Sequence, residues 1–453
     1  MELLHTVVMF LVVLLVLVSI HEWGHFYIAR RCGVKVQRFS VGFGKPFWRI
    51  YDKHGTEFAI APIPLGGYVK MLDETDENIP EQDKNKTFES RKTWQQIAIL
   101  FAGPAANFIL AAILFWVLAL QPATMPSPVI GEVKPNSPAA FAGVEGGQQI
   151  VAVDGHAVVS RADVYEQLMH RLGETGSIML TVQYPDNDAL RYDMELVIDN
   201  WMKGVEAPDP MEGLGLSFFR PTIPAVIGRV LDDSPAAAAG LQVGDEIIAI
   251  DNIDVTDWAQ WSEYVRERPE QSVQLKVRRE EAHLTLNITP KLVEVDGYGK
   301  IGQIGVGAAQ INWPEEMLIQ RELGPIAAVN EALADTWSNS VMVLVSIKKL
   351  LLGEISVKNL SGPIGIAKVA GDSARAGLQY YVHFMAVLSV YLGVFNLLPI
   401  PILDGGRIVF CLAEGIKGGP VSDRAKMISM QLGLMFLGVL MVMAFYYDIM
   451  RLQ

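Results

Sequence analysis

Residues 3–29 read LLHTVVMFLVVLLVLVSIHEWGHFYIA, an apolar run that ends in a His-Glu-x-x-His pattern. The hydrocarbon core of a bilayer is about 30 Å thick and needs about 20 apolar residues as a helix, so this run is long enough to span a membrane. We expect a retained span rather than a cleaved signal peptide, because the segment begins without basic residues, is too long and lacks an Ala-x-Ala pattern.

The composition agrees with a membrane protein that carries a separate acidic part. The 453 residues are 51% hydrophobic, and the mean hydropathy is +0.27. Residues 121–375 hold 20 Lys and Arg against 35 Asp and Glu, whereas the rest of the chain is slightly basic. This balance argues against nucleic acid as a partner. The two cysteines, Cys32 and Cys411, lie outside the acidic part, which therefore has no disulfide.

Hydropathy predicts a multi-pass α-helical membrane protein with four transmembrane helices. The first span is assigned to residues 1–30, and the others to 94–120, 376–410 and 427–449. A fifth apolar stretch at 341–355 is too short to span and carries two lysines. We expect it to be an amphipathic helix on the membrane surface.

Positive charge predicts the orientation of these spans. Lysines and arginines are frequent in the loops 31–93 and 411–426, which should therefore be cytoplasmic. Both termini and residues 121–375 then face outside, which in a bacterium is the periplasm. From Leu3 to His21 the helix extends about 27 Å, so the His-Glu-x-x-His pattern should lie toward the cytoplasmic side of the inner membrane.

A tandem repeat organises the acidic part. Residues 129–158 and 226–255 align without a gap at an offset of 97, with 15 of 30 positions identical. This repeat predicts two compact β-rich units, at 121–220 and 221–310, followed by a linker at 311–375. Their Ser-Pro-Ala-Ala helix and Gly turn resemble those of PDZ domains, which bind extended peptides by strand addition. The alternatives are spacer units, or a filter that excludes bulky substrates without binding peptide.

The His-Glu-x-x-His pattern carries the chemistry. His21 and His25 are four residues apart and share one helix face, so their neutral imidazoles can meet one Zn²⁺ at about 2.0–2.1 Å. Glu22 lies beside the open coordination position, where it can take a proton from zinc-bound water. The alternative is a polar patch that only packs helices, although each buried acid costs about 2.5–3.5 kcal/mol near the bilayer centre.

A third ligand is expected from the third span. Asp404 is its acidic residue, and it follows Pro399 and Pro401, which should break the helix. Irregular backbone at membrane depth is tolerated where it is buried in protein or lines a wet cavity. Two histidines, Asp404 and a water would complete a catalytic zinc site.

Several motifs together resemble the site-2 protease family of intramembrane zinc metalloproteases. The His-Glu-x-x-His pattern in the first span pairs with NLLPIPILDGG at 396–406 in the third. The similarity covers essentially the whole chain, and its further motifs are GFGK at 42–45, PLGGYVKM at 64–71, AGPAANF at 102–108 and NLSGPIGIA at 359–367.

The resemblance implies roles at the matching positions. His21, His25 and Asp404 would hold one catalytic zinc, and Glu22 would be the general base. Asn396 would position the substrate or stabilise the oxyanion, since an amide donor suits a tetrahedral intermediate. The alternative for Asn396 is that it caps backbone groups freed by the prolines.

The family also has a membrane-associated β-hairpin that pairs with an unwound substrate. PLGGYVKM would form it here, with Gly66 and Gly67 in the tight turn and with Tyr68 and Val69 against the substrate. The alternative is an ordinary cytoplasmic loop.

The substrates implied by the resemblance are transmembrane peptides. They include a single-pass anti-sigma factor of an envelope stress response, cut after a first periplasmic cleavage, and remnant signal peptides. The PDZ-like pair would then act as a size filter or a peptide binder.

Two positions depart from the family pattern. Tyr391 stands where we expect Asn, which puts a second amide contact to substrate in doubt. Arg407 stands where His is frequent, and we expect this change to concern only the cytoplasmic cap of the site.

Two other function classes remain to be weighed. One is a membrane scaffold whose PDZ-like pair recruits partners beside a vestigial zinc site. The other is a zinc transporter, although the single ligand set and the large outer units argue against it.

Overall fold

Four long apolar helices form the centre of the computed structural model, which describes all residues except 1, 75–78, 186, 296–298, 310–312 and 452–453. Within that part of the chain, four helices have the length and hydropathy of membrane spans, the predicted number. They are α1 (Glu2–Arg31), α2 (Thr93–Ala119), α10 (Leu378–Leu397) and α12 (Asp423–Met450). Helices α1, α2 and α10 pack against one another through buried apolar side chains of all three.

The predicted third span, 376–410, is divided into two helices by the break that Pro399 and Pro401 led us to expect. Helix α10 ends at Leu397, a loop contains Pro399 and Pro401, and α11 (Asp404–Lys417) begins at Asp404. Proline lacks the N–H that a helix interior needs, which explains the break. The predicted loop 411–426 is therefore helical as far as Lys417.

The predicted linker 311–375 is also largely helical. Helix α8 (Pro325–Leu351) and helix α9 (Pro363–Ala376) occupy most of it. Each begins with proline at its first position, where the missing N–H costs nothing. The amphipathic segment expected at 341–355 is thus only the second half of α8, which packs against α2 and α10.

A four-stranded sheet follows α1, in place of the predicted hairpin. It consists of β1 (Val36–Phe43), β2 (Trp48–Tyr51), β3 (Glu57–Ile60) and β4 (Ile63–Met71), in the order β2-β3-β1-β4. Strand β1 pairs in parallel with β3 and antiparallel with β4. Gly66 and Gly67 lie inside β4, so their prediction as a tight turn is wrong. The chain reverses earlier, at Ala61 and Pro62 between β3 and β4.

The repeat forms two units whose first seven elements follow the same order, and each unit has its own apolar core. Ser137 and Ser234 cap equivalent short helices by accepting the N–H groups of Ala140 and Ala237. The first unit contains β6 (Ile130–Val133), α3 (Pro138–Phe141), β7 (Gln149–Val153), β8 (His156–Ala157), α4 (Arg161–Met169), β9 (Gly176–Tyr184), β10 (Asn187–Ile198), α5 (Pro210–Leu214) and β11 (Leu216–Phe218). The second contains β12 (Ile227–Val230), α6 (Pro235–Ala238), β13 (Glu246–Ile250), β14 (Ile253–Asp254), α7 (Trp258–Arg266), β15 (Val273–Arg279), β16 (Ala282–Ile288), β17 (Lys291–Val295), β18 (Gly299–Gln303) and β19 (Val306–Ala308).

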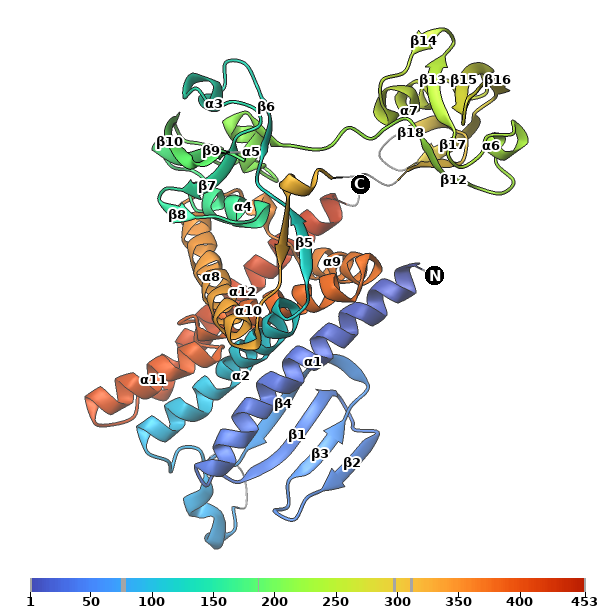
Figure 1. The fold of residues 1–453 in the computed structure, drawn as a ribbon. Helices are drawn as coiled ribbons and strands as arrows, with labels where there is room; N and C mark the ends of the chain where they lie inside the picture. The colour runs from blue at the N-terminus through green and yellow to red at the C-terminus, as the bar shows by residue number, and fades with distance from the viewer. Residues whose placement is uncertain (1, 75–78, 186, 296–298, 310–312, 452–453) are drawn as a thin grey trace.

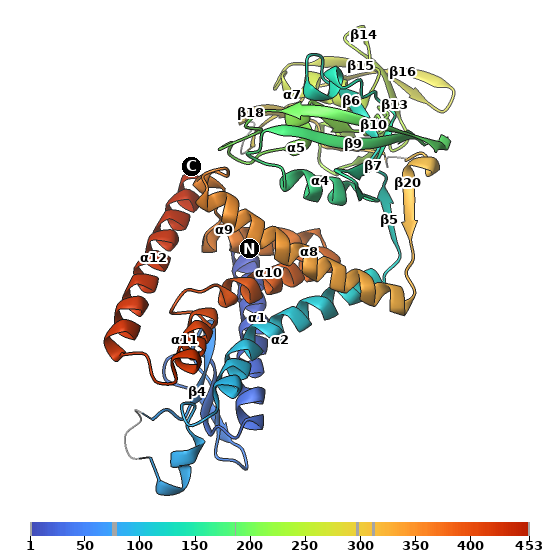
Figure 2. The same cartoon turned by 90° about the vertical axis from the view of Figure 1, so that its left-hand side faces the viewer.

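Both units lie at the end of the molecule opposite the four-stranded sheet (Figures 1 and 2). A two-stranded stalk of β5 (Ala123–Pro126) and β20 (Leu318–Arg321) connects them to the helices. The first unit also docks on α8, where the buried Lys349 donates to the carbonyl of Leu172 at 2.5 Å and to Glu174 at 3.1 Å. The end of the helix bundle nearest the two units is therefore tied to the first unit.

Helix α12 stands apart from the other spans for most of its length (Figure 2). Among its described residues only Gly433 and Asp448 are buried. The Asp448 carboxylate accepts three backbone N–H groups at the start of α9, from Gly362, Ile364 and Gly365, at 2.9–3.0 Å. A carboxylate at a helix N-terminus is a favourable pairing, so the last turn of α12 is held against α9.

The junction of the first unit with α8 predicts a pH-dependent stability. Burial, together with nearby Glu331, raises the pKa of Asp335 from 3.8 to about 6; Arg321, Glu166 and Asp163 also face it. A raised carboxyl pKa stabilises the fold at low pH, and this stabilisation is lost as pH rises through about 6. We expect Asp335→Asn to raise the melting temperature at pH 7.5, by a few degrees at most, and to bring no gain at pH 4.

Thermal unfolding of the purified chain across this pH range measures the effect. Asp232→Asn, at an exposed position of the second unit, is the control. An Asp335→Asn variant that melts below the wild type at pH 7.5 would contradict the expectation.

Candidate metal centre

The structure brings His21, His25 and Asp404 together. The two histidines lie one turn apart near the end of α1 and are 8% and 6% exposed. Asp404 begins α11, directly after the proline loop. Its Oδ2 lies 3.2 Å from Nε2 of His21 and 3.3 Å from Nε2 of His25, and the two Nε2 atoms are 3.2 Å apart.

This triangle fits a zinc ion. Zinc bonds of about 2.0–2.1 Å in a tetrahedron place neighbouring ligand atoms about 3.3–3.4 Å apart. The three measured separations are 3.2, 3.2 and 3.3 Å. Two imidazole nitrogens and one carboxylate oxygen also leave a fourth position open, as catalytic zinc sites require. In the part of the chain that the structure describes, this is the one such group of His, Cys, Asp and Glu side chains.

Two glycines allow the proline loop to deliver Asp404. A Cβ on Gly405 would lie 2.3 Å from the carbonyl oxygen of Leu397, and one on Gly406 would lie 2.2 Å from that of Ile400. Real Cβ atoms do not approach oxygen so closely. The return of the chain under the end of α10 therefore depends on glycine at both positions.

Helix α2 supplies the outer partners of the histidines. His25 Nδ1 donates to the carbonyl of Ile99 at 2.8 Å, and His21 Nδ1 lies 3.1 Å from the side-chain amide of Asn107. Between them, a Cβ on Gly103 would lie 2.2 Å from His25 Nε2. Sequence reasoning missed Ile99, Gly103 and Asn107. The motif AGPAANF at 102–108 contains Gly103 and Asn107 and was the available signal for these two, whereas Ile99 lies outside it.

A cavity of about 250 Å³ opens on the three ligand atoms. Glu22 lies in it, and its carboxylate is within backbone hydrogen-bond reach of Val69 on β4. The Glu22 carboxylate is thus next to the three ligand side chains without being one of them. Its lining residues are His21, Glu22, His25, Tyr68, Val69, Met71, Leu100, Asn396, Ile402, Leu403, Asp404 and Arg407.

The other predicted residues divide into two groups. Asn396, Tyr68 and Val69 line the cavity, whereas Gly66 and Gly67 lie in β4 without lining it. The amide nitrogen of Asn396 donates to the carbonyl of Leu392 at 3.0 Å, a backbone contact of the kind named as its alternative role.

The hydroxyl of Tyr68 accepts a hydrogen bond from Nη1 of Arg38 at 3.0 Å, and this bond holds the Tyr68 side chain beside the cavity. Of the two departures from the family pattern, Arg407 lines the cavity and is exposed, so its expected place in the cytoplasmic cap of the site stays a prediction. Its guanidinium also lies 5.3 Å over the ring of Phe88. Tyr391 lies outside the set of residues that line this cavity.

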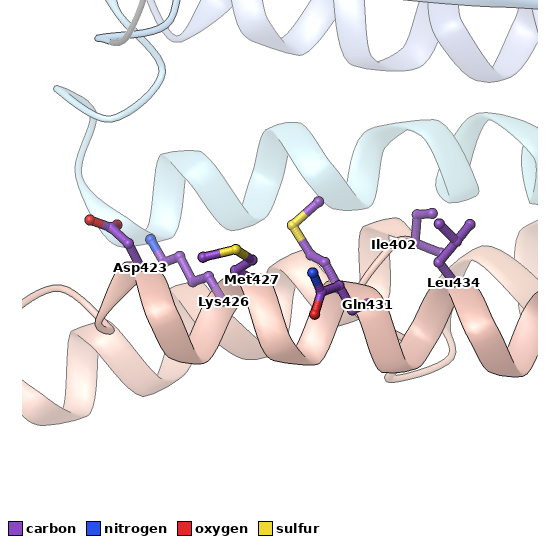
Figure 3. A pocket seen from close by; sticks show the side chains of 7 residues that line it. Ile402, Asp423, Lys426, Met427, Gln431 and Leu434 are labelled. Carbon is purple, nitrogen blue, oxygen red and sulfur yellow. The ribbon is translucent and has the colours of Figure 1, made fainter.

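A second cavity, of about 440 Å³, lies along α12 (Figure 3). It is lined by Ile402, Asp423, Lys426, Met427, Met430, Gln431 and Leu434. Ile402 lines both cavities, so this side chain separates an apolar groove on α12 from the ligand triangle.

Comparison with known proteins identifies the family. The sequence profile of peptidase family M50 matches residues 9–440. The chain is 40% identical over 443 residues to the regulator of sigma-E protease RseP of Salmonella typhimurium, with 98% of both chains covered. Against the protein of the same name from Escherichia coli, identity is 40% over 444 residues, again with 98% of both chains covered.

Two further comparisons complete the set. A Vibrio cholerae protein described as a predicted zinc metalloprotease is 34% identical over 451 residues, with 100% of both chains covered. The PDZ domain of an SdrC-like protein from Listeria innocua is 24% identical and covers 20% of this chain and 97% of its own, but at a TM-score of 0.17 it supports no argument. The resemblance to the site-2 proteases is confirmed over nearly the full length, and the chain belongs to peptidase family M50, whose members are membrane-bound zinc metalloproteases.

Proposed function

We propose that this chain is an intramembrane zinc endopeptidase that cleaves transmembrane segments of single-pass proteins. The observation that carries the proposal is the triangle of His21, His25 and Asp404 with Glu22 in the same cavity. Two of the ligands and the carboxylate sit on a membrane-length apolar helix. Ionisable groups at that depth are costly, so a function explains them better than packing does.

The three ligand residues, Glu22 and Asn396 have distinct roles in this proposal. His21, His25 and Asp404 would hold the zinc, which would supply Lewis acidity at neutral pH. Glu22 accepts a proton from the attacking water and later returns it to the leaving amine. Asn396 faces the same cavity, and its amide donor would shift from Leu392 to the developing oxyanion.

Strand β4 is the proposed docking edge for substrate. Peptide hydrolysis needs an accessible carbonyl, and a transmembrane helix hides its carbonyls in i to i−4 hydrogen bonds. The sheet order ends at β4, which packs against α1 and carries Tyr68 and Val69 into the cavity. A substrate that unwinds there would exchange helical bonds for bonds to the edge of β4.

We further propose the orientation and the substrate class. The basic loops favour a cytoplasmic four-stranded sheet, periplasmic termini and a periplasmic pair of PDZ-like units, with the metal centre toward the cytoplasmic side. The relatives named as regulators of sigma-E protease suggest an anti-sigma factor as one substrate, with remnant signal peptides as another. The two outer units would exclude substrates that have not been trimmed outside the membrane, or bind peptide.

Replacement of Glu22 tests the catalytic assignment. We expect Glu22→Gln to lower cleavage of a labelled transmembrane peptide by about 10²–10⁴-fold, the usual contribution of a general base. Zinc content, measured by atomic absorption, should be unchanged because Glu22 is outside the ligand triangle. Glu195→Gln, on the exposed face of β10, is the matched control.

A zinc chelator provides the second arm of that experiment. Purified wild-type protein should lose activity on chelation and regain it with added zinc. Cleavage at the wild-type rate by Glu22→Gln would remove Glu22 as the base, and cleavage insensitive to chelation would overturn the proposed function.

The stalk allows a clean test of the size filter. Pro126 and Leu318 are already paired, so replacing residues 127–317 by a short Gly-containing turn should close a β-hairpin on the membrane helices. We expect the variant that lacks these residues to cleave a substrate with an intact periplasmic domain. We expect the full chain not to cleave that substrate. The same deletion with Glu22→Gln is the inactive control, and unchanged discrimination between trimmed and untrimmed substrate would exclude a filter.

A further inference from the structure

We propose that Asn107 is a positioning residue of the metal centre, whose side-chain oxygen accepts the Nδ1 proton of His21 when zinc is bound. This inference rests on the proposed zinc site. It goes beyond it because Asn107 belongs to a different helix and does not contact the metal.

Helix α2 turns one face toward the two histidines. Ile99, Gly103 and Asn107 are spaced by four and therefore lie on one side of the helix. The three residues contact, in order, the far side of His25, the space beside its Nε2, and the far side of His21. One stripe of α2 thus backs both imidazoles.

Zinc binding requires one particular tautomer of His21 and of His25. Nε2 of each histidine points to Asp404 and to the other histidine, so the metal-binding lone pairs belong to Nε2. A neutral imidazole that binds metal through Nε2 carries its proton on Nδ1. For His25 this proton has an acceptor, the carbonyl of Ile99 at 2.8 Å. The same rule requires an acceptor for His21.

The side-chain amide of Asn107 faces His21. Its Nδ2 is placed 3.1 Å from His21 Nδ1, while its Oδ1 is buried and has no partner among the described residues. The two amide atoms have nearly the same shape, and the hydrogen-bond network decides which is which. A protonated Nδ1 cannot face an amide N–H, so the zinc-loaded site needs Oδ1 turned toward His21.

Asn107 also lies between α1, which carries the two histidines, and α10. It is 0% exposed, and its backbone carbonyl accepts from Oγ of Ser389 on α10 at 2.9 Å. Helix α10 leads directly to the loop that delivers Asp404. A fully buried amide with one unpaired atom needs a reason to persist in an apolar helix, and the His21 contact supplies it.

Zinc affinity of the full-length purified protein tests the proposal, measured by competition with a metallochromic chelator. We expect Asn107→Leu, which keeps the volume but removes the acceptor, to weaken zinc binding by about 10–100-fold. Asn107→Asp keeps an acceptor oxygen and removes the donor, so its affinity should stay within about 3-fold of the wild type or become tighter. Asn339→Leu, in which a helix-borne Asn bonding to the carbonyl of Asp335 is replaced far from the metal centre, is the matched control.

Each outcome decides the question. Wild-type affinity in Asn107→Leu, or a loss of 10-fold or more in Asn107→Asp, overturns the acceptor role. If Asn107→Leu does not fold, as judged by gel filtration and circular dichroism, Asn107→Asp alone decides in the same way. Failure of the wild-type protein to bind zinc would instead contradict the proposed function.

Discussion

The fold is organised by one requirement, that two imidazole nitrogens and a carboxylate oxygen meet within about 3.3 Å of one another inside an apolar helix bundle. The histidines come from α1 and the carboxylate from α11, more than 370 residues later in the chain. The helix break, the two glycines after Asp404 and the close approach of α2 are each needed to satisfy it. An apolar core without these groups would be easier to build, which is why we assign them a chemical purpose.

The same requirement explains why irregular backbone is present at membrane depth. Ile402 and Leu403 of the loop between α10 and α11 line the cavity. Backbone polar groups that lack helical partners are tolerated at membrane depth when they line such a cavity. On the opposite wall, β4, the last strand in the order of its sheet, lies beside Glu22. A helix break and a sheet edge therefore face each other across the ligand triangle, and this pairing suits a substrate that must be unwound before it is cut.

Local patterns allowed much of the site to be predicted from the sequence. The local spacing of a single helix turn identifies His21, Glu22 and His25. Two prolines mark the helix break before Asp404 and so identify it. Gly66 and Gly67 were misplaced because strand register depends on pairing with β1, which no local pattern reveals. Asn107 was missed because its role exists only once α2 packs on α1. The extent of α8 was underestimated because its first half buries only Ala328, Ala332 and Thr336 and leaves most of its apolar side chains exposed, so hydropathy does not mark it as a buried helix.

X-ray absorption spectroscopy of the zinc-loaded, full-length protein tests the central claim most directly. Our account predicts a zinc ion with nitrogen and oxygen neighbours at about 2.0–2.1 Å, including the outer-ring scattering of two imidazoles, and no sulfur. A sulfur neighbour at about 2.3 Å would place the metal on Cys32 or Cys411 instead, and one imidazole or none would contradict the triangle of His21, His25 and Asp404.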